Sequence, residues 1–140
     1  MSSEESEPPA EIARAINLLW TVFWIQAGQG AWIYATVAWP LIEPSEALLG
    51  AVAVAAMVMI GAAFTAFFLR RVRAGRRWAR ILVAIGFAVS IPDAALDLAD
   101  WVDSPLWLSA LSVIQIGAYG YAVVLLFGDP GGRWYAARRR

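Results

Sequence analysis

Apolar residues fill four stretches of the chain, and each stretch is long enough to cross a lipid bilayer as a helix. At about 1.5 Å per residue, roughly 20 apolar residues span the hydrocarbon core of a membrane. Short segments rich in proline, glycine or charge separate the stretches, so neighbouring helices are expected to run antiparallel. The pattern predicts an all-α integral membrane four-helix bundle with up-down-up-down topology. The expected spans cover residues 12–34, 47–69, 78–98 and 106–127.

The two ends of the chain differ in composition from the apolar domain expected at residues 12–135. Residues 1–11 are acidic and contain two prolines, which is typical of a disordered tail. Residues 136–140 end in three arginines and form a short basic tail. A cleaved signal peptide is the alternative for the first stretch, but such peptides begin with a basic segment, whereas four glutamates precede Arg14. We therefore expect the first stretch to be retained as a span.

The charged residues divide between the two sides that this topology defines. All eleven cationic residues are arginines. One lies at the start of the first stretch, six lie between the second and third stretches, and four follow the fourth. Cytoplasmic loops of membrane proteins carry an excess of Lys and Arg. The sequence therefore predicts that both termini are cytoplasmic, with five acidic residues on the arginine side and six on the opposite side.

The amino-acid composition excludes several kinds of functional site. Hydrophobic residues make up 61% of the chain, which is outside the usual range of soluble domains. The lack of cysteine excludes disulfides, thiol redox couples and Cys-based zinc sites, and the lack of histidine excludes bis-histidine haem ligation. The sequence contains no glycine-rich phosphate loop, metal-ligand cluster or nucleophile–base pair. We therefore expect no enzyme activity and no cofactor.

Three of the expected spans carry polar side chains at a similar depth. Counted from the cytoplasmic ends of the spans, Gln26, Gln29, Asp93 and Gln115 lie roughly 18–22 Å into the membrane. Tyr119 shares a helix face with Gln115. An aspartate at this depth costs about 2.5–3.5 kcal/mol, so it would have to be protonated, hydrated or hydrogen-bonded. These five residues form a candidate intramembrane polar site.

A second interpretation of Asp93 stays open. Ser90, Pro92 and Asp93 match an N-cap, a proline near the first turn and an acidic residue at the third helical position. Asp93 would then cap a new amphipathic helix at the outer surface. Against this, a span from Trp78 to Ser90 would cover only about 20 Å of a hydrocarbon core about 30 Å thick.

The connection between the second and third stretches holds six arginines in eleven residues. The orientation in the membrane explains them, but such a cluster also attracts anionic lipid head groups, at about 1 kcal/mol for each arginine near the surface. Nucleic-acid binding is not expected for a short loop held at a membrane. The candidate anionic-lipid contacts are Arg70, Arg71, Arg73, Arg76, Arg77 and Arg80.

Small residues mark one face of the second stretch. At about 100° per residue, Ala51, Ala55, Ala62 and Ala66 fall within a narrow arc and form two pairs of small residues four positions apart. Such a face allows close helix packing. It predicts either a contact within the bundle or the seam of a homodimer.

Two motifs resemble those of small four-span bacterial membrane proteins of unknown function. One is the Arg-x-Gly-Arg-Arg-Trp-Ala-Arg run from Arg73 to Arg80, and the other is Leu-Leu-Phe-x-x-Pro-x-x-x-Trp-Tyr from Leu125 to Tyr135. The resemblance covers the last three stretches. It implies a bacterial plasma-membrane protein and implies no particular activity.

Three functions are compatible with these features, the third being an intramembrane enzyme that would need Asp93 and a second group within hydrogen-bond reach. The leading hypothesis is a non-catalytic membrane protein that acts as an accessory or scaffolding component and packs against another membrane protein. The alternative is a small cation or proton-coupled transporter, or an intramembrane ligand-binding protein, that uses Asp93 and the glutamine layer. Membrane lipids are expected partners in each case, and a membrane protein or a second copy of the chain is the further candidate.

Overall fold

The computed structural model describes residues 8–99, 105–129 and 131–137, with the side chains of 93, 94 and 96–99 left out. Helices are the only regular secondary structure in these residues, which confirms the predicted all-α class. In chain order they are α1 (Ala10–Ile33), the π-helical turn η2 (Tyr34–Ala38), the 3-10 turn η3 (Trp39–Leu41), α2 (Ala47–Arg73), α3 (Arg77–Ala99), α4 (Leu106–Phe127) and α5 (Gly131–Ala137).

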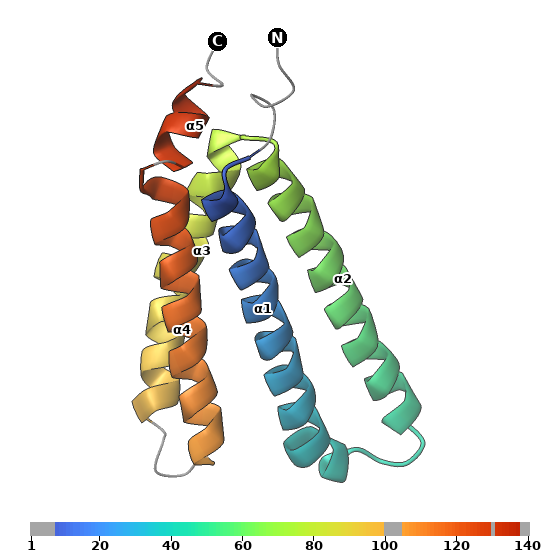
Figure 1. The fold of residues 1–140 in the computed structure, drawn as a ribbon. Coiled ribbons are helices and arrows are strands. Elements are labelled where there is room, and N and C mark those ends of the chain that lie inside the picture. Colours follow the sequence, from blue (N-terminus) through green and yellow to red (C-terminus); the bar gives the residue numbers. More distant parts are fainter. Residues whose placement is uncertain (1–7, 100–104, 130, 138–140) are drawn as a thin grey trace.

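The four long helices run in alternating directions along the molecule (Figure 1). The turn between α2 and α3, the end of α4 and the short helix α5 therefore lie at the same end as the start of α1. We call this end the arginine end, because the arginines in the described part of the chain lie near the helix ends that meet there or in the turn between α2 and α3. They are Arg14, Arg70, Arg71, Arg73, Arg76, Arg77, Arg80 and Arg133.

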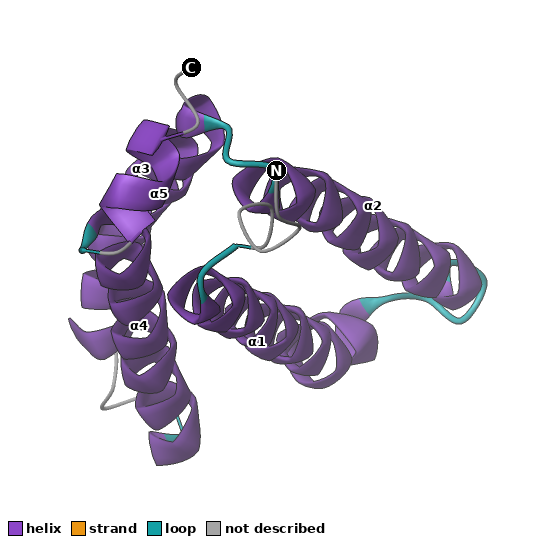
Figure 2. Ribbon diagram, turned by 45° about the horizontal axis from the view of Figure 1, so that its top comes forward, coloured by secondary structure: helices purple, strands orange, loops and turns teal. Residues whose placement is uncertain are grey.

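Helix α1 lies between α2 and α4, and α3 packs on α4 (Figure 2). The antiparallel α1–α4 pair stays in contact far from the arginine end. There the rings of Trp32 and Trp107 meet edge to face with centroids 5.3 Å apart. One turn away, Gln29 Nε2 donates to the Leu108 carbonyl at 3.5 Å. This pair is the central contact of the bundle.

Helix α2 ends in a Schellman motif that starts the turn into α3. Gly75 has a positive φ of 74°, its N–H donates to the Val72 carbonyl, and the Arg76 N–H donates to the Arg71 carbonyl, both at 3.0 Å. Glycine occupies this left-handed position without the steric cost that a side chain would bring. Helix α2 thus ends at Arg73, four residues beyond the expected limit at Leu69, and the motif reverses the chain there.

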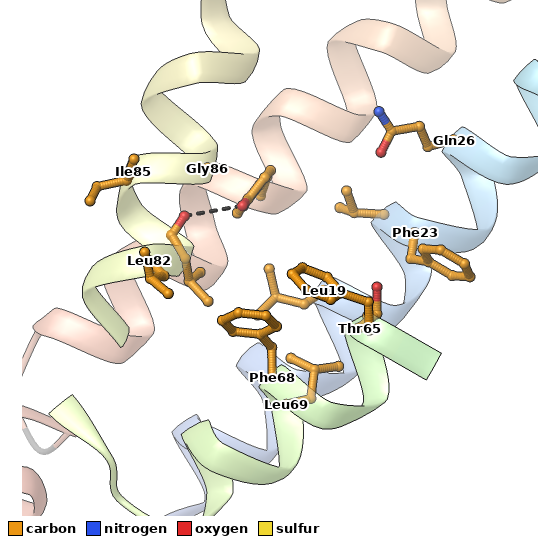
Figure 3. Close-up of a pocket in the computed structure, with 13 residues that line it drawn as sticks. Leu19, Phe23, Gln26, Thr65, Phe68, Leu69, Leu82, Ile85 and Gly86 are labelled. Carbon is orange, nitrogen blue, oxygen red and sulfur yellow. Dashed lines mark hydrogen bonds between the residues drawn. The ribbon is translucent and has the colours of Figure 1, made fainter. Parts of the chain in front are cut away.

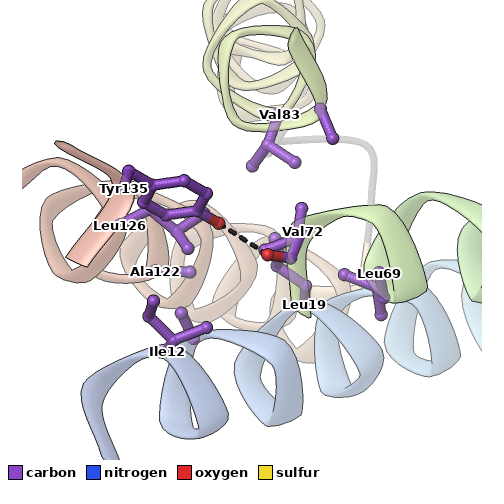
Figure 4. Packing of buried hydrophobic residues seen from close by; sticks show 10 residues of the cluster. Ile12, Leu19, Leu69, Val72, Val83, Ala122, Leu126 and Tyr135 are labelled. Carbon is purple, nitrogen blue, oxygen red and sulfur yellow. Dashed lines mark hydrogen bonds between the residues drawn. The ribbon is translucent and has the colours of Figure 1, made fainter. Parts of the chain in front are cut away.

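The buried core gathers at the arginine end (Figure 4). At its centre Tyr135 of α5 is 1% exposed, and its hydroxyl donates to the Val72 carbonyl of α2 at 2.8 Å. Helix α2 has no buried residue before Leu69. The helices are therefore packed closely at the arginine end and less tightly away from it. The core consists of Ile12, Ala15, Leu19, Leu69, Val72, Ala79, Val83, Ala122, Leu126 and Tyr135.

The sequence analysis did not foresee α5, since it expected no helix after the span at residues 106–127. Gly131 is buried, and a Cβ at this position would lie 2.7 Å from the Leu125 carbonyl oxygen. Glycine thus lets α5 fold directly onto the end of α4. The Arg133 guanidinium donates to the Asp129 carboxylate at 2.6 Å across this turn, and that hydrogen bond lowers the pKa of Asp129.

The interpretation in which Asp93 caps a new helix is wrong, because the backbone of α3 is continuous there. Helix α3 continues through Pro92 to Ala99, so no new helix begins at Ser90. The Ser90 hydroxyl instead donates to the Phe87 carbonyl one turn back, at 2.8 Å. A proline inside a helix removes one backbone hydrogen bond, and the helical turns on both sides can continue around it. The side chain of Asp93 itself lies outside the described residues.

We expect Tyr135→Phe to lower the free energy of unfolding by about 0.5–1.5 kcal/mol, because it removes the hydrogen bond to Val72 while the ring still fills the core. Tyr135→Ala should cost about 3–5 kcal/mol, because it also leaves a cavity. Denaturant unfolding of the purified protein in detergent, followed by tryptophan fluorescence, measures both. Tyr121→Phe is the matched control, since Tyr121 is 55% exposed on α4. Equal effects at the two tyrosines would contradict the role assigned to Tyr135.

Candidate functional site

A cavity of about 450 Å³ lies among the four long helices, next to the core on the side away from the arginine end (Figure 3). Its volume falls within the roughly 300–1,000 Å³ typical of ligand pockets. Helices α1, α2 and α3 each contribute four lining residues, and α4 contributes one. The lining consists of Leu19, Val22, Phe23, Gln26, Phe64, Thr65, Phe68, Leu69, Leu82, Val83, Ile85, Gly86 and Tyr119.

Three polar side chains interrupt this apolar lining. The Tyr119 hydroxyl donates to the Val83 carbonyl at 3.0 Å, so its proton is already used within the protein. Gln26 and Thr65 border the cavity from α1 and α2. An apolar surface with a few polar groups is the usual character of a site for a largely apolar ligand. The arrangement suits binding, and it provides no pair of groups for acid–base or nucleophilic chemistry.

Two glycines and two aromatic rings join α3 to α4 beside the cavity. A Cβ on Gly86 of α3 would lie 2.6 Å from the Tyr119 hydroxyl of α4, and a Cβ on Gly120 of α4 would lie 3.1 Å from the Phe87 ring of α3. Each helix therefore receives an aromatic side chain of the other at a glycine. The Phe87 and Tyr119 rings also meet edge to face, with centroids 5.4 Å apart. This reciprocal packing sets the position of Tyr119 in the cavity wall.

The structure brings only part of the predicted polar layer to the cavity. Gln26 and Tyr119 line the cavity, although Gln26 is largely exposed. Gln29 turns to α4 through its bond to the Leu108 carbonyl, and Gln115 is half-buried on α4 outside the cavity lining. The side chain of Asp93 is not described, so its part in the site stays a prediction. Among the described side chains, no cluster of acidic groups could hold a metal ion.

The six arginines near the α2–α3 turn fall into different environments. Arg80 is half-buried, with its guanidinium carbon 4.4 Å from the centre of the Phe127 ring and 4.7 Å from that of Tyr135. Its Nη1 donates to the Leu126 carbonyl at 3.4 Å. Arg80 therefore holds α3 against α4 and α5, while its neighbours Arg70, Arg71, Arg73 and Arg76 are exposed.

The sequence analysis missed the apolar residues that line the cavity. Phe64 and Phe68 on α2, and Leu82 and Ile85 on α3, were treated only as parts of membrane spans. A signal was present, because each pair lies on one face of its helix at a spacing of four or three residues. It could not be interpreted before the relative rotation of the two helices was known.

Similarity to known proteins adds no information about this site. No family model matches the chain, and comparisons with curated proteins and with solved structures find no match either. The resemblance of the Arg73–Arg80 and Leu125–Tyr135 motifs to small four-span membrane proteins therefore stays a prediction.

We expect Gly86→Ala to destabilise the protein by about 1–3 kcal/mol, because the new methyl group would collide with the Tyr119 hydroxyl. Removing that hydroxyl should relieve the collision, so Gly86→Ala combined with Tyr119→Phe should be more stable than Gly86→Ala alone. Unfolding free energies of the two single variants and the double variant give the coupling. Gly117→Ala is the control, since a Cβ at Gly117 meets nothing within 4 Å. Additive effects at Gly86 and Tyr119 would contradict the packing described here.

Proposed function

We propose that the chain is a four-span protein of the bacterial plasma membrane with both termini in the cytoplasm. Helices α2 and α4 are long and apolar enough to cross a membrane by length and composition. The most apolar part of α2 is 0% buried within the chain, which is unlike the core helix of a soluble domain. Among the described residues only α2 and α4 pass this test of length and composition, and α1 and α3, with 24 and 23 residues, are long enough to reach across a core about 30 Å thick. The arginine end would face the cytoplasm, in keeping with the positive-inside rule.

Within that membrane we propose a non-catalytic role as an accessory or scaffolding component that packs against another membrane protein. The observation that carries this proposal is the exposure of α2. The helix has 27 residues, yet only Leu69 and Val72 are buried, both near the arginine end. Its remaining length presents a continuous apolar surface. Lipid can cover such a surface, and so can the helix of a partner.

The face of α2 with small residues is the part best suited to a partner helix. Ala51 and Ala55 are exposed, and Ala62 and Ala66 are half-buried. The contact within the bundle predicted for this face is thus incomplete along its first half. Because membrane helices associate through close packing of small residues, this half is available to a partner protein or a second copy of the chain.

The cavity favours a second function, the binding of an apolar ligand inside the membrane. It lies among the helices, and Gln26, Thr65 and Tyr119 interrupt an otherwise apolar lining. This deepens the ligand-binding alternative of the sequence analysis. Transport of a cation or a proton-coupled solute through Asp93 stays a separate hypothesis.

The proposed topology predicts which positions are accessible from outside the cell. Since the chain has no cysteine, Ser45→Cys and Ala136→Cys each introduce a unique thiol, and both positions are exposed. Ser45→Cys should react with a membrane-impermeant maleimide in intact cells, whereas Ala136→Cys should react only after permeabilisation. The reverse pattern would overturn the orientation. Labelling of both positions in intact cells would overturn the even number of spans.

The proposed accessory role predicts a partner that depends on α2. Affinity capture from the native membrane in a mild detergent should recover a membrane protein in fixed stoichiometry. Ala55→Leu should lower its recovery about tenfold, equivalent to roughly 1.4 kcal/mol, because the larger side chain prevents close helix packing. Ala56→Leu makes the same change at a neighbouring exposed position about 100° around the helix and should have little effect. Recovery of the chain alone as a monomer would contradict this role.

A further inference from the structure

The cavity is open to the side, between α2 and α3. The two helices meet at the Gly75 turn, where the Phe68 and Trp78 rings touch edge to face with centroids 5.6 Å apart, and they diverge from there (Figure 2). Three of the lining residues on these helices are well exposed, namely Phe64 at 63%, Leu82 at 42% and Ile85 at 51%. We call this opening the α2–α3 groove. In a membrane it would face the acyl chains of the lipids.

The two walls of the groove have matching patterns. On α2, Phe64, Phe68 and Arg71 are spaced i, i+4 and i+7, and on α3 Trp78, Leu82 and Ile85 have the same spacing. Each set therefore lies on one face of its helix. Because the helices run antiparallel, Arg71 and Trp78 both stand at the arginine end, and the apolar residues extend from them for about 10 Å.

We propose that an anionic phospholipid of the cytoplasmic leaflet binds in the α2–α3 groove, with one acyl chain in the cavity and its phosphate beside Arg71. The proposal rests on the membrane location proposed above and does not depend on a partner protein. Arg71 is exposed, with its guanidinium carbon 5.0 Å from the centre of the Phe67 ring. This stacking would hold the guanidinium at the membrane surface while its N–H groups stay free to donate to phosphate oxygens.

The charges nearby complement a negative head group. Arg76 lies beside Arg71, since its backbone N–H donates to the Arg71 carbonyl. Arg70 and Arg76 are exposed and raise the local positive potential, whereas Arg80 is engaged by Phe127, Tyr135 and the Leu126 carbonyl. Trp78 is 43% exposed at the same level, where an aromatic side chain suits the interface between head groups and hydrocarbon.

The lining of the cavity suits an acyl chain. Its part on α1 runs from Leu19 to Gln26, a rise of about 10 Å. Among the lining residues only Gln26, Thr65 and Tyr119 carry polar side chains. An apolar space that opens beside exposed arginines matches a phospholipid, which joins an apolar chain to a charged head group.

The test is lipid binding to the purified full chain, delipidated in detergent and followed by native mass spectrometry. The probes are phosphatidylglycerol and phosphatidylcholine with identical acyl chains. We expect one phosphatidylglycerol to bind per chain, with clear preference over phosphatidylcholine. Arg71→Ala should weaken phosphatidylglycerol binding about fivefold, the effect of one arginine near a membrane surface. Arg73→Ala makes the same charge change about 160° further round α2 and should weaken binding by less than about twofold.

A second pair of variants tests the acyl-chain part of the site. Thr65→Phe places a larger side chain in the cavity and should abolish the single phosphatidylglycerol adduct. Ala63→Phe makes a similar addition at an exposed position outside the cavity lining and should leave the adduct unchanged. Far-UV circular dichroism of all variants confirms that they are folded. Arg71→Ala keeps the test decisive if Thr65→Phe fails to fold.

Three results would overturn the proposal. The first is equal binding of the two lipids together with equal effects of Arg71→Ala and Arg73→Ala, which would mean that the arginines set only orientation. The second is an adduct that survives Thr65→Phe in a folded protein. The third is a crosslink from Ile85→Cys to a second copy or a partner helix, which would assign the groove to protein. Recovery of the chain in the soluble fraction without detergent would instead refute the membrane location on which this inference rests.

Discussion

The closure of one end of the bundle by α5 is the constraint on which the rest of the structure depends. Tyr135 enters the core from α5 and bonds to the last turns of α2, while Arg80 of α3 stacks on Tyr135 and on Phe127 of α4. Both interactions act between elements distant in the chain. Buried glycine at position 131 makes them possible by bringing α5 down onto α4. The four long helices are thus tied together at the arginine end, where nearly all of the core is found.

Because the helices are joined at the arginine end, their packing differs from pair to pair away from it. The α1–α4 pair stays in contact through Trp32 and Trp107, and α3 stays on α4 through the glycine and aromatic packing at Gly86 and Gly120. Helix α2 packs on α1, where Phe23 lies against Gly61, but it has no buried residue before Leu69 and diverges from α3. The cavity and its lateral opening are consequences of this uneven packing. Between α3 and α4, by contrast, the Phe87 and Tyr119 rings pack against Gly120 and Gly86 and against each other.

The sequence was sufficient to predict the helices but not their relative rotation. Long apolar runs bounded by proline, glycine and charge define the four long helices, because helix formation depends on local pattern. Helix α5 escaped prediction because its stability comes from the burial of Tyr135 against distant residues. Pro92 appeared to start a helix, whereas the turns around it tolerate one missing hydrogen bond. Of the predicted polar site, Gln26 and Tyr119 share the cavity, and Gln29 bonds elsewhere, since rotations of a few tens of degrees decide which residues converge.

The arginine end combines two physical roles that the sequence presents as one cluster. Arg80 is withdrawn from solvent and contributes to the closure of the bundle, whereas Arg71 is exposed beside the groove and is available to an anion. In the topology proposed above, the positive charge of the arginine end would lie at the cytoplasmic surface, where it would favour this orientation and concentrate anionic lipid. A groove that opens directly beneath exposed arginines would therefore encounter a phosphate and an acyl chain in the geometry of a single lipid. The same arginines would then determine both the orientation of the chain and its binding of lipid. Arg80 would differ from Arg71 because it is half-buried and holds the helices together.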